Sequence, residues 1–157
     1  MTLSIHKQAV DFSLTSTSSQ IFTLHKDLRH KACILFFYSS DFNASCTQEI
    51  CEFKDKYSLF KKYGVEIIGI SQDDIVTHLA FKSKYDLPFE LLSDPNAEVS
   101  ELYQALFPVF KFSKRTTYLL NKQHMIIAVY ENLFESKKHV QYMLEKLKEL
   151  QSASIAL

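Results

Sequence analysis

Two apolar runs, residues 32–38 and 65–71, place the strongest limit on how this chain of 157 residues can fold. Each is a predominantly apolar stretch without the strict alternation of a half-exposed strand, the pattern of a strand buried on both faces of a sheet. The segment between them carries the apolar repeat of an amphipathic helix. A buried strand, a helix and a second buried strand form a βαβ unit, so we expect the two strands to pair in parallel.

The flanking segments extend this unit into a mixed α/β arrangement. Two β-prone runs near the start surround a Ser/Thr-rich turn and indicate a hairpin, and two more near the end indicate another. The expected elements are strands at 11–14, 20–24, 116–120 and 125–130, a short strand leading into a turn at 91–95, and helices from Cys46 to about residue 62 and at 74–85, 96–103 and 135–150. We therefore predict a thioredoxin-like α/β domain over residues 1–150, with a central mixed sheet flanked by helices and an N-terminal β-hairpin. Residues 151–157 are predicted to form a frayed tail.

The composition narrows the classes of function. Basic and acidic residues balance at 18 each, and the chain has only two glycines, Gly64 and Gly69. The chain contains no basic run with interleaved aromatic residues, so its sequence does not predict nucleic-acid binding. Two isolated glycines can form neither a dinucleotide-binding fingerprint nor a phosphate-binding loop. Gly64 is expected to end a helix. The scattered histidines and cysteines lack zinc-site spacing, so we expect neither a metal nor another cofactor.

The chain lacks the apolar patterns of a secretion signal or a membrane span. No apolar stretch approaches the length of a membrane-crossing helix, and the N-terminal residues have no apolar core of a signal peptide. We therefore expect a cytoplasmic protein that does not bind membranes. In such a reducing compartment, paired cysteines are more often catalytic or metal-binding than structural.

Two cysteines five residues apart lie at the start of the helix between the apolar strands. Cys46 opens an apolar stripe that runs to Phe60, while Cys51 falls about 140° around the helix axis. Ser45 is the predicted N-cap, with Gln48 as its capping-box partner. Ideal helix geometry places the two cysteine Cα atoms about 8 to 9 Å apart, beyond the roughly 7 Å that a disulfide spans. A bond between them therefore requires the first turns of the helix to unwind.

The position of Cys46 also favours reactivity. A thiol in the first helical turn feels the positive end of the helix dipole, which favours the thiolate that attacks peroxides and disulfides. A free cysteine is more often a small buried core residue, and we keep that interpretation for Cys33 inside the first apolar strand. For Cys46, the helix start and the nearby second thiol make a nucleophile the better hypothesis.

Residues 37–53 (FYSSDFNASCTQEICEF) resemble the active-site segment of peroxiredoxins, within the alkyl hydroperoxide reductase and thiol-specific antioxidant superfamily. The closest resemblance is to the Q-type, bacterioferritin-comigratory group. Supporting blocks are residues 9–14, 69–73, 87–94 and 114–120. The resemblance implies a thioredoxin-dependent peroxidase that reduces hydrogen peroxide and organic hydroperoxides.

The resemblance also implies roles for individual residues. Cys46 would be the peroxidatic thiolate that becomes a sulfenic acid, and Cys51 the resolving thiol that condenses with it. Thioredoxin or a similar thiol reductant would reset the disulfide. Arg115 would keep Cys46 ionised and bind the peroxide oxygens, while Glu49 would brace Arg115. From the residues alone, a surface ion pair for Arg115 and a solvated first-turn acid for Glu49 remain open.

Two positions depart from the pattern of the family, which carries a proline at Ser39 and a threonine at Asn43. A threonine hydroxyl donates and accepts through one atom, whereas asparagine uses two different atoms, so Asn43 cannot supply the same relay. The alternative function is therefore a catalytically weakened redox sensor or binding protein on the same scaffold. A thioredoxin-type oxidoreductase is disfavoured, because its cysteines are only three residues apart.

We expect a monomer or a weak dimer. A run of large apolar residues precedes the strand at 116–120, and it could form a dimer patch or an apolar rim over the site. Core packing is the expectation for at least half of its members, which are Phe107, Val109, Phe110 and Phe112.

Overall fold

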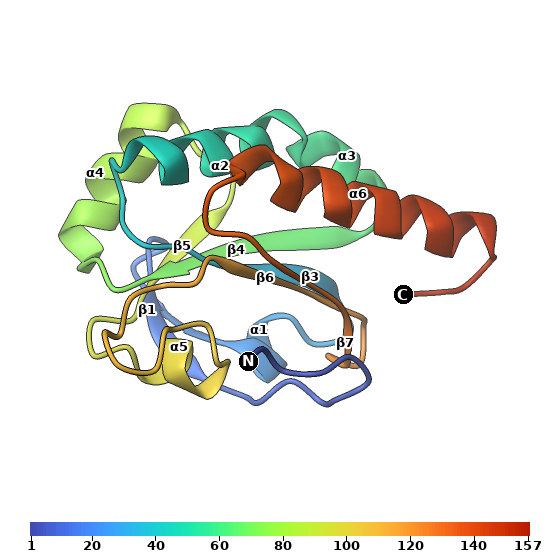
Figure 1. Ribbon diagram of the computed structural model, residues 1–157. Coiled ribbons are helices and arrows are strands. Elements are labelled where there is room, and N and C mark those ends of the chain that lie inside the picture. The colour runs from blue at the N-terminus through green and yellow to red at the C-terminus, as the bar shows by residue number, and fades with distance from the viewer.

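The computed structural model describes all 157 residues, with helices on both faces of one mixed sheet (Figure 1). The strands are β1 (Ser13–Ser16), β2 (Ile21–Thr23), β3 (Ala32–Phe37), β4 (Val65–Ser71), β5 (Glu90–Ser93), β6 (Thr116–Leu120) and β7 (Ile126–Glu131). The helices are α1 (Leu24–Asp27), α2 (Ala44–Asp55), α3 (Tyr57–Lys62), α4 (Ile75–Tyr85), α5 (Glu98–Leu102) and α6 (Ser136–Ser152). No helix is both long enough and apolar enough to cross a membrane.

The sheet has the strand order β2-β1-β5-β4-β3-β6-β7. Strands β3 and β4 pair in parallel, which confirms the predicted βαβ unit, and β5 joins β4 in parallel. The hairpins β1–β2 and β6–β7 are antiparallel, also as predicted. Because β3 and β4 are central and parallel, their carboxyl ends meet at one edge of the sheet, and the loop that leads into α2 starts there.

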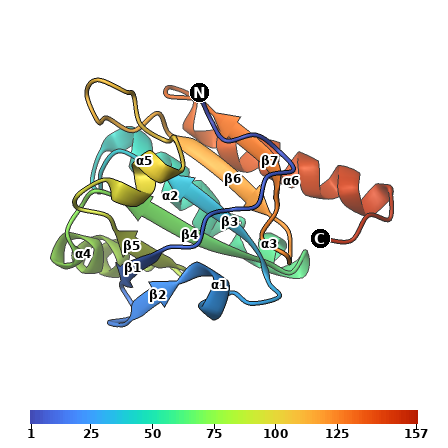
Figure 2. The same cartoon turned by 90° about the horizontal axis from the view of Figure 1, so that it is seen from below.

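Side-chain alternation along β3 divides the core into two layers. Ala32, Ile34 and Phe36 belong to the core beneath α2, α3, α4 and α6, whereas Cys33 and Leu35 belong to the opposite core, which α1 and α5 cover. Figure 2 shows α1 and α5 on that second face. Complete burial of Cys33 confirms that it is a core residue, and desolvation raises the pKa of its thiol.

The helix expected to continue to residue 62 is divided in two. Helix α2 ends at Asp55, and Lys56 closes it with a hydrogen bond from its N–H to the carbonyl of Glu52. The Lys56 carbonyl in turn accepts the first hydrogen bonds of α3. Gly64 ends α3 with φ of +74°, a conformation that favours glycine. Helix α6 runs to Ser152, two residues beyond the expected end.

The apolar run before β6 is exposed, so the expectation of core packing is wrong. Phe107 and Phe112 are about two-fifths and one-half exposed (37% and 48%), while Val109 and Phe110 are 80% and 82% exposed. The cause is a closed loop. An isolated bridge pairs Leu106 with Ser113, and the Phe107 N–H donates to the Phe112 carbonyl, so the side chains between them project outward.

Candidate active site

Asn43 caps helix α2, at the edge of the sheet where β3 ends. Its Oδ1 accepts hydrogen bonds from the backbone N–H groups of Ser45 and Cys46, both at 3.1 Å. The prediction that Ser45 is the N-cap is therefore wrong. Asparagine is among the strongest N-caps, and its position two residues earlier lets its planar amide reach both free N–H groups. The Asn43 oxygen is thus committed to the backbone.

Ser45 lies inside the first turn and links two other parts of the chain. Its Oγ accepts a hydrogen bond from Arg115 Nη1 at 2.5 Å and lies 3.0 Å from the hydroxyl of Ser136, the first residue of α6. Its backbone carbonyl accepts from Arg115 Nη2 at 3.1 Å. The residue before Cys46 therefore connects the start of α2 to Arg115 and to the start of α6.

Arg115 is buried just before β6, with a positive φ of 57° that is uncommon for a residue other than glycine. Its Nη1 donates to Ser45 Oγ and to the carbonyl of Leu133, and its Nη2 donates to the carbonyl of Ser45 and to Glu49 Oε2. All four Nη hydrogens are therefore used. The Nε–H is the only guanidinium donor left, and it is buried without a partner.

Glu49 lies one turn after Cys46 and is completely buried. Its Oε2 accepts from Arg115 Nη2 at 2.5 Å, so the predicted contact between the two residues is present and the alternative of a solvated acid is excluded. Burial raises the pKa of Glu49 to about 7, although the charge and hydrogen bond of Arg115 act in the opposite direction. Its second oxygen, Oε1, has no hydrogen-bond partner.

These unpaired atoms single out the site. Buried polar groups are almost always hydrogen-bonded, and exceptions call for a functional explanation. Only three buried side-chain N or O atoms lack a partner, and two of them are Arg115 Nε and Glu49 Oε1; the third is the hydroxyl of Thr116, the next residue after Arg115. Two of these atoms therefore belong to residues at the start of β6, and the third belongs to Glu49 of α2, which contacts Arg115.

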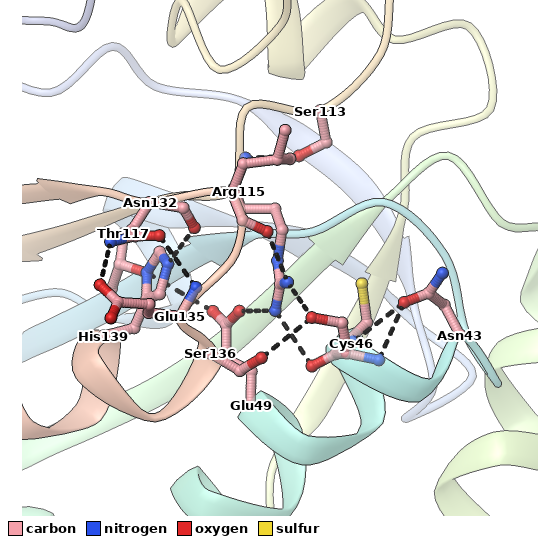
Figure 3. Close-up of polar contacts among 12 residues, drawn as sticks. Asn43, Cys46, Glu49, Ser113, Arg115, Thr117, Asn132, Glu135, Ser136 and His139 are labelled. Atoms are coloured by element: carbon pink, nitrogen blue, oxygen red, sulfur yellow. Dashed lines mark hydrogen bonds and ion pairs between the residues drawn. The ribbon is translucent and has the colours of Figure 1, made fainter.

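Both candidate cysteines lie in α2 as free thiols. Cys46 is buried, and its sulfur points away from the helix between the side chains of Asn43 and Arg115 in Figure 3. Cys51 is half-buried, and desolvation raises the pKa of its thiol, with a further contribution from the charge of Asp55. Since both residues belong to one continuous helix, a disulfide between them requires that helix to open.

His139 and Thr117 complete the site, and the sequence interpretation missed both. The Nδ1 atom of His139 lies 2.8 Å from Thr117 Oγ1 and 3.7 Å from Glu49 Oε1, while its Nε2 lies 2.8 Å from the carbonyl of Asn132. The available signal was a histidine on the apolar face of an amphipathic helix, beside Val140. Such a histidine is usually only a satisfied core residue, so the pattern alone does not distinguish it.

A second buried cluster lies on the other side of the α2 start. Asp41 accepts from the Tyr38 hydroxyl and from His78 Nδ1, both at 2.6 Å, and its N–H donates to Asp73 Oδ2. The ligand-type atoms of Asp41, Asp73 and His78 lie within 4.8 Å of one another, a spacing that suits a metal ion. Each of these residues already makes hydrogen bonds inside the cluster, and Ser71 also donates to Asp73. The donor set therefore fits a closed hydrogen-bond network better than a metal centre.

Comparison with known proteins identifies the family of this chain. Residues 5–129 match the AhpC/TSA family, and the chain therefore belongs to that family. Its relatives place it in the peroxiredoxin Q group of the family. It is 38% identical over 145 residues to a chloroplastic peroxiredoxin Q of Oryza sativa subsp. japonica, and 37% identical over 140 residues to one of Populus jackii. These alignments cover 92% and 88% of this chain, which spans 65% of the length of each relative.

The fold is that of solved peroxiredoxins. The crystal structure of peroxidoxin BcpB from Mycobacterium tuberculosis aligns with a TM-score of 0.86 at 23% identity, covering 93% of this chain and 97% of the other. The predicted thioredoxin-like α/β fold with an N-terminal hairpin is therefore confirmed.

Proposed function

We propose that this protein is a thiol-dependent peroxidase in which Cys46 attacks hydrogen peroxide and organic hydroperoxides. One observation carries the proposal: a buried cysteine in the first turn of a helix lies beside a buried arginine that retains one unpaired N–H donor. The helix N-terminus and Arg115 favour the thiolate. The Nε–H supplies a donor for the oxygen on which negative charge develops during attack.

The proposed cycle consumes one peroxide and two thiols. The Cys46 thiolate attacks the O–O bond, and with one proton taken up, the products are a Cys46 sulfenic acid and water or an alcohol. The Cys51 thiol then condenses with the sulfenic acid, and the S–S bond forms as a second water leaves. A dithiol reductant of the thioredoxin type cleaves that bond by exchange and restores both thiols. The start of α2 opens before the S–S bond forms.

The role proposed for Asn43 is narrower than that of the threonine usual in this family. Its Oδ1 accepts from the Cys46 N–H, so that N–H is shared with the cap instead of being free for a substrate oxygen. Its Nδ2 makes no hydrogen bond within the protein and can donate to a peroxide, but it cannot pass on a proton through the same atom. This observation favours the alternative function, a redox sensor or binding protein with weakened turnover on the same scaffold.

A stopped-flow experiment separates the two functions. Reduced protein is mixed with hydrogen peroxide or an organic hydroperoxide, and the oxidation of Cys46 is followed by tyrosine fluorescence or by a thiol probe. The peroxidase proposal predicts oxidation much faster than that of a free thiol, and repeated turnover when thioredoxin is added. Oxidation at the rate of a free thiol would reject the peroxidase and support the sensor. A cytoplasmic location, a monomer or weak dimer, and the absence of a cofactor stay predictions.

A further inference from the structure

The hydrogen bonds of His139 define its protonation. Its Nε2 lies 2.8 Å from the carbonyl of Asn132, and because a carbonyl only accepts, Nε2 carries a hydrogen. Its Nδ1 lies 2.8 Å from Thr117 Oγ1, whose hydroxyl can donate to it. With that hydroxyl as the donor, the ring is neutral and the Nδ1 lone pair is directed at Thr117. Burial lowers the pKa of His139 to about 4, which agrees with this assignment.

Glu49 Oε1 lies beside the same ring nitrogen. It lies 3.7 Å from His139 Nδ1, farther than a hydrogen bond allows, and it has no other partner. Nδ1 accepts from the Thr117 hydroxyl, so no donor lies between Nδ1 and Oε1, and the buried Oε1 stays unpaired, an arrangement that costs free energy. One added proton would supply the missing donor, either as an imidazolium whose Nδ1–H is shared by Thr117 Oγ1 and Glu49 Oε1, or as a carboxylic acid that donates to Nδ1 once the Thr117 hydroxyl turns away.

We propose that His139 is a positioning residue for the peroxide reaction: together with Glu49 it holds one exchangeable proton, and the presence of that proton determines how much of the positive charge of Arg115 is available to the Cys46 thiolate. This inference rests on the proposed peroxidase function for its consequence, although the proton itself can be detected without peroxide.

The charges around Glu49 explain the effect. Arg115 approaches Glu49 from the start of β6, His139 approaches it from α6, and Cys46 lies one turn earlier on α2. The Tyr130 ring of β7 packs edge-on against the His139 ring, with 4.9 Å between the ring centroids. An ionised Glu49 neutralises Arg115, whereas a protonated Glu49 leaves Arg115 to interact with the thiolate. Burial raises the pKa of Glu49 to about 7, so the proton is exchanged near neutral pH.

The substitution His139→Gln tests this role, with His124→Gln as its matched control. A glutamine amide can donate to Oε1 and hold Glu49 ionised at lower pH. His124 is also buried, with its Nε2 bonded to the carbonyl of Leu28, far from the site. We expect His139→Gln to slow Cys46 oxidation on the order of tenfold at pH 6, and by no more than about twofold at pH 8.5, where Glu49 is ionised in the wild type as well. His124→Gln should follow the wild-type profile. An equal loss at both pH values, or no loss, would overturn the role of His139.

A second measurement does not depend on peroxide or on a stable variant. The ¹³C chemical shift of the Glu49 carboxyl carbon, followed by NMR in the reduced wild type, should titrate near neutral pH. In Cys46→Ser the midpoint should move to lower pH, because the thiolate no longer competes for Arg115. Titration of Glu49 near pH 4.5, the ordinary value for a glutamate, would overturn the inference. A neutral midpoint in a protein that reacts no faster than a free thiol would reject the peroxidase function and leave the proton-holding pair in place.

Discussion

Two buried histidine–carboxylate pairs lie on either side of the α2 start, and they differ in one respect. In the pair of His78 and Asp41, both ring nitrogens face acceptors, the Asp41 carboxylate at 2.6 Å and the Leu92 carbonyl at 3.0 Å. Both ring nitrogens are therefore hydrogen-bonded, and the network is complete. In the pair of His139 and Glu49, the two facing atoms are 3.7 Å apart and Glu49 Oε1 has no partner.

The contrast distinguishes a structural network from a reactive one. A buried polar network with every bond made is rigid, and here it anchors the loop between β3 and α2 to α4. A network with unpaired donors and acceptors is less stable in isolation, but it offers those atoms to a substrate or a proton. We therefore interpret the first cluster as the support of the site and the second, with Arg115, as its chemistry.

The largest expected effects come from the two thiols. Cys46→Ser should abolish peroxide reduction, because the nucleophile is lost. Cys51→Ser should still form one sulfenic acid, which mass spectrometry after dimedone labelling detects, but it should form no disulfide and show no recycling by thioredoxin. Normal turnover of Cys51→Ser with thioredoxin would remove Cys51 as the resolving residue.

A substitution in the closed cluster should affect stability and spare the chemistry. His78→Leu leaves the buried Asp41 carboxyl without its histidine partner, which costs about 3 to 5 kcal/mol of folding free energy. Urea unfolding measures this loss. For the fraction that stays folded, the rate of Cys46 oxidation should remain within about threefold of wild type. The reason is that none of the hydrogen bonds of His78 reaches Cys46 or Arg115, and substitutions without shared partners act nearly independently. A stable His78→Leu protein with a much slower reaction would reverse our assignment of the two clusters.

Restoring the threonine of the family should accelerate the reaction. A hydrogen bond to a charged group is worth about 1.5 to 3 kcal/mol, so Asn43→Thr is expected to speed Cys46 oxidation roughly ten- to a hundredfold. The cap should weaken by a few tenths of a kcal/mol, because threonine caps somewhat less well than asparagine. Stopped-flow rates for both proteins provide the test. An unchanged rate would mean that Asn43 already supplies the bond, and a slower variant would mean that the site is built around asparagine.

The smallest effect concerns the pH dependence of stability. The pKa of Glu49 is about 7 when folded, above its ordinary value of 4.5, so the folded state binds more protons between these pH values and stability falls as pH rises through that window. Glu49→Gln does not titrate there. Relative to this variant, wild type should lose about 2 kcal/mol of unfolding free energy between pH 5 and pH 8. Parallel stability curves for reduced wild type and variant would show that burial does not control this carboxyl group.

The elements that follow from local patterns could be predicted from the sequence. The apolar runs of β3 and β4 and the turn between β1 and β2 determine the βαβ unit and the hairpin, whereas the strand order depends on long-range pairing that no local pattern contains. The exposed loop before β6 was misjudged because its composition resembles core sequence, and only the bridge between Leu106 and Ser113 turns its side chains outward.

The site could also be predicted only in part, because some of its contacts join residues that are distant in the sequence. The contact between Arg115 and Glu49 followed from the family resemblance, and the structure contains it. The cap was assigned to Ser45 because a serine three residues before a glutamine has the capping-box spacing, but in three dimensions Arg115 occupies that hydroxyl and Asn43 caps the helix. His139 could not be predicted, since its role depends on an unpaired oxygen of another helix.

The rate of Cys46 oxidation in Arg115→Lys tests the central claim most directly. Lysine keeps the positive charge but lacks the planar fork and the Nε–H that the site leaves unpaired. If that donor stabilises the developing charge, the second-order rate with peroxide should fall about a hundredfold or more, as on removal of one preorganised donor, while His78→Leu stays near wild type. A rate for Arg115→Lys within about threefold of wild type would show that charge alone suffices, and it would contradict the assignment of the unpaired Arg115 donor as the centre of the chemistry.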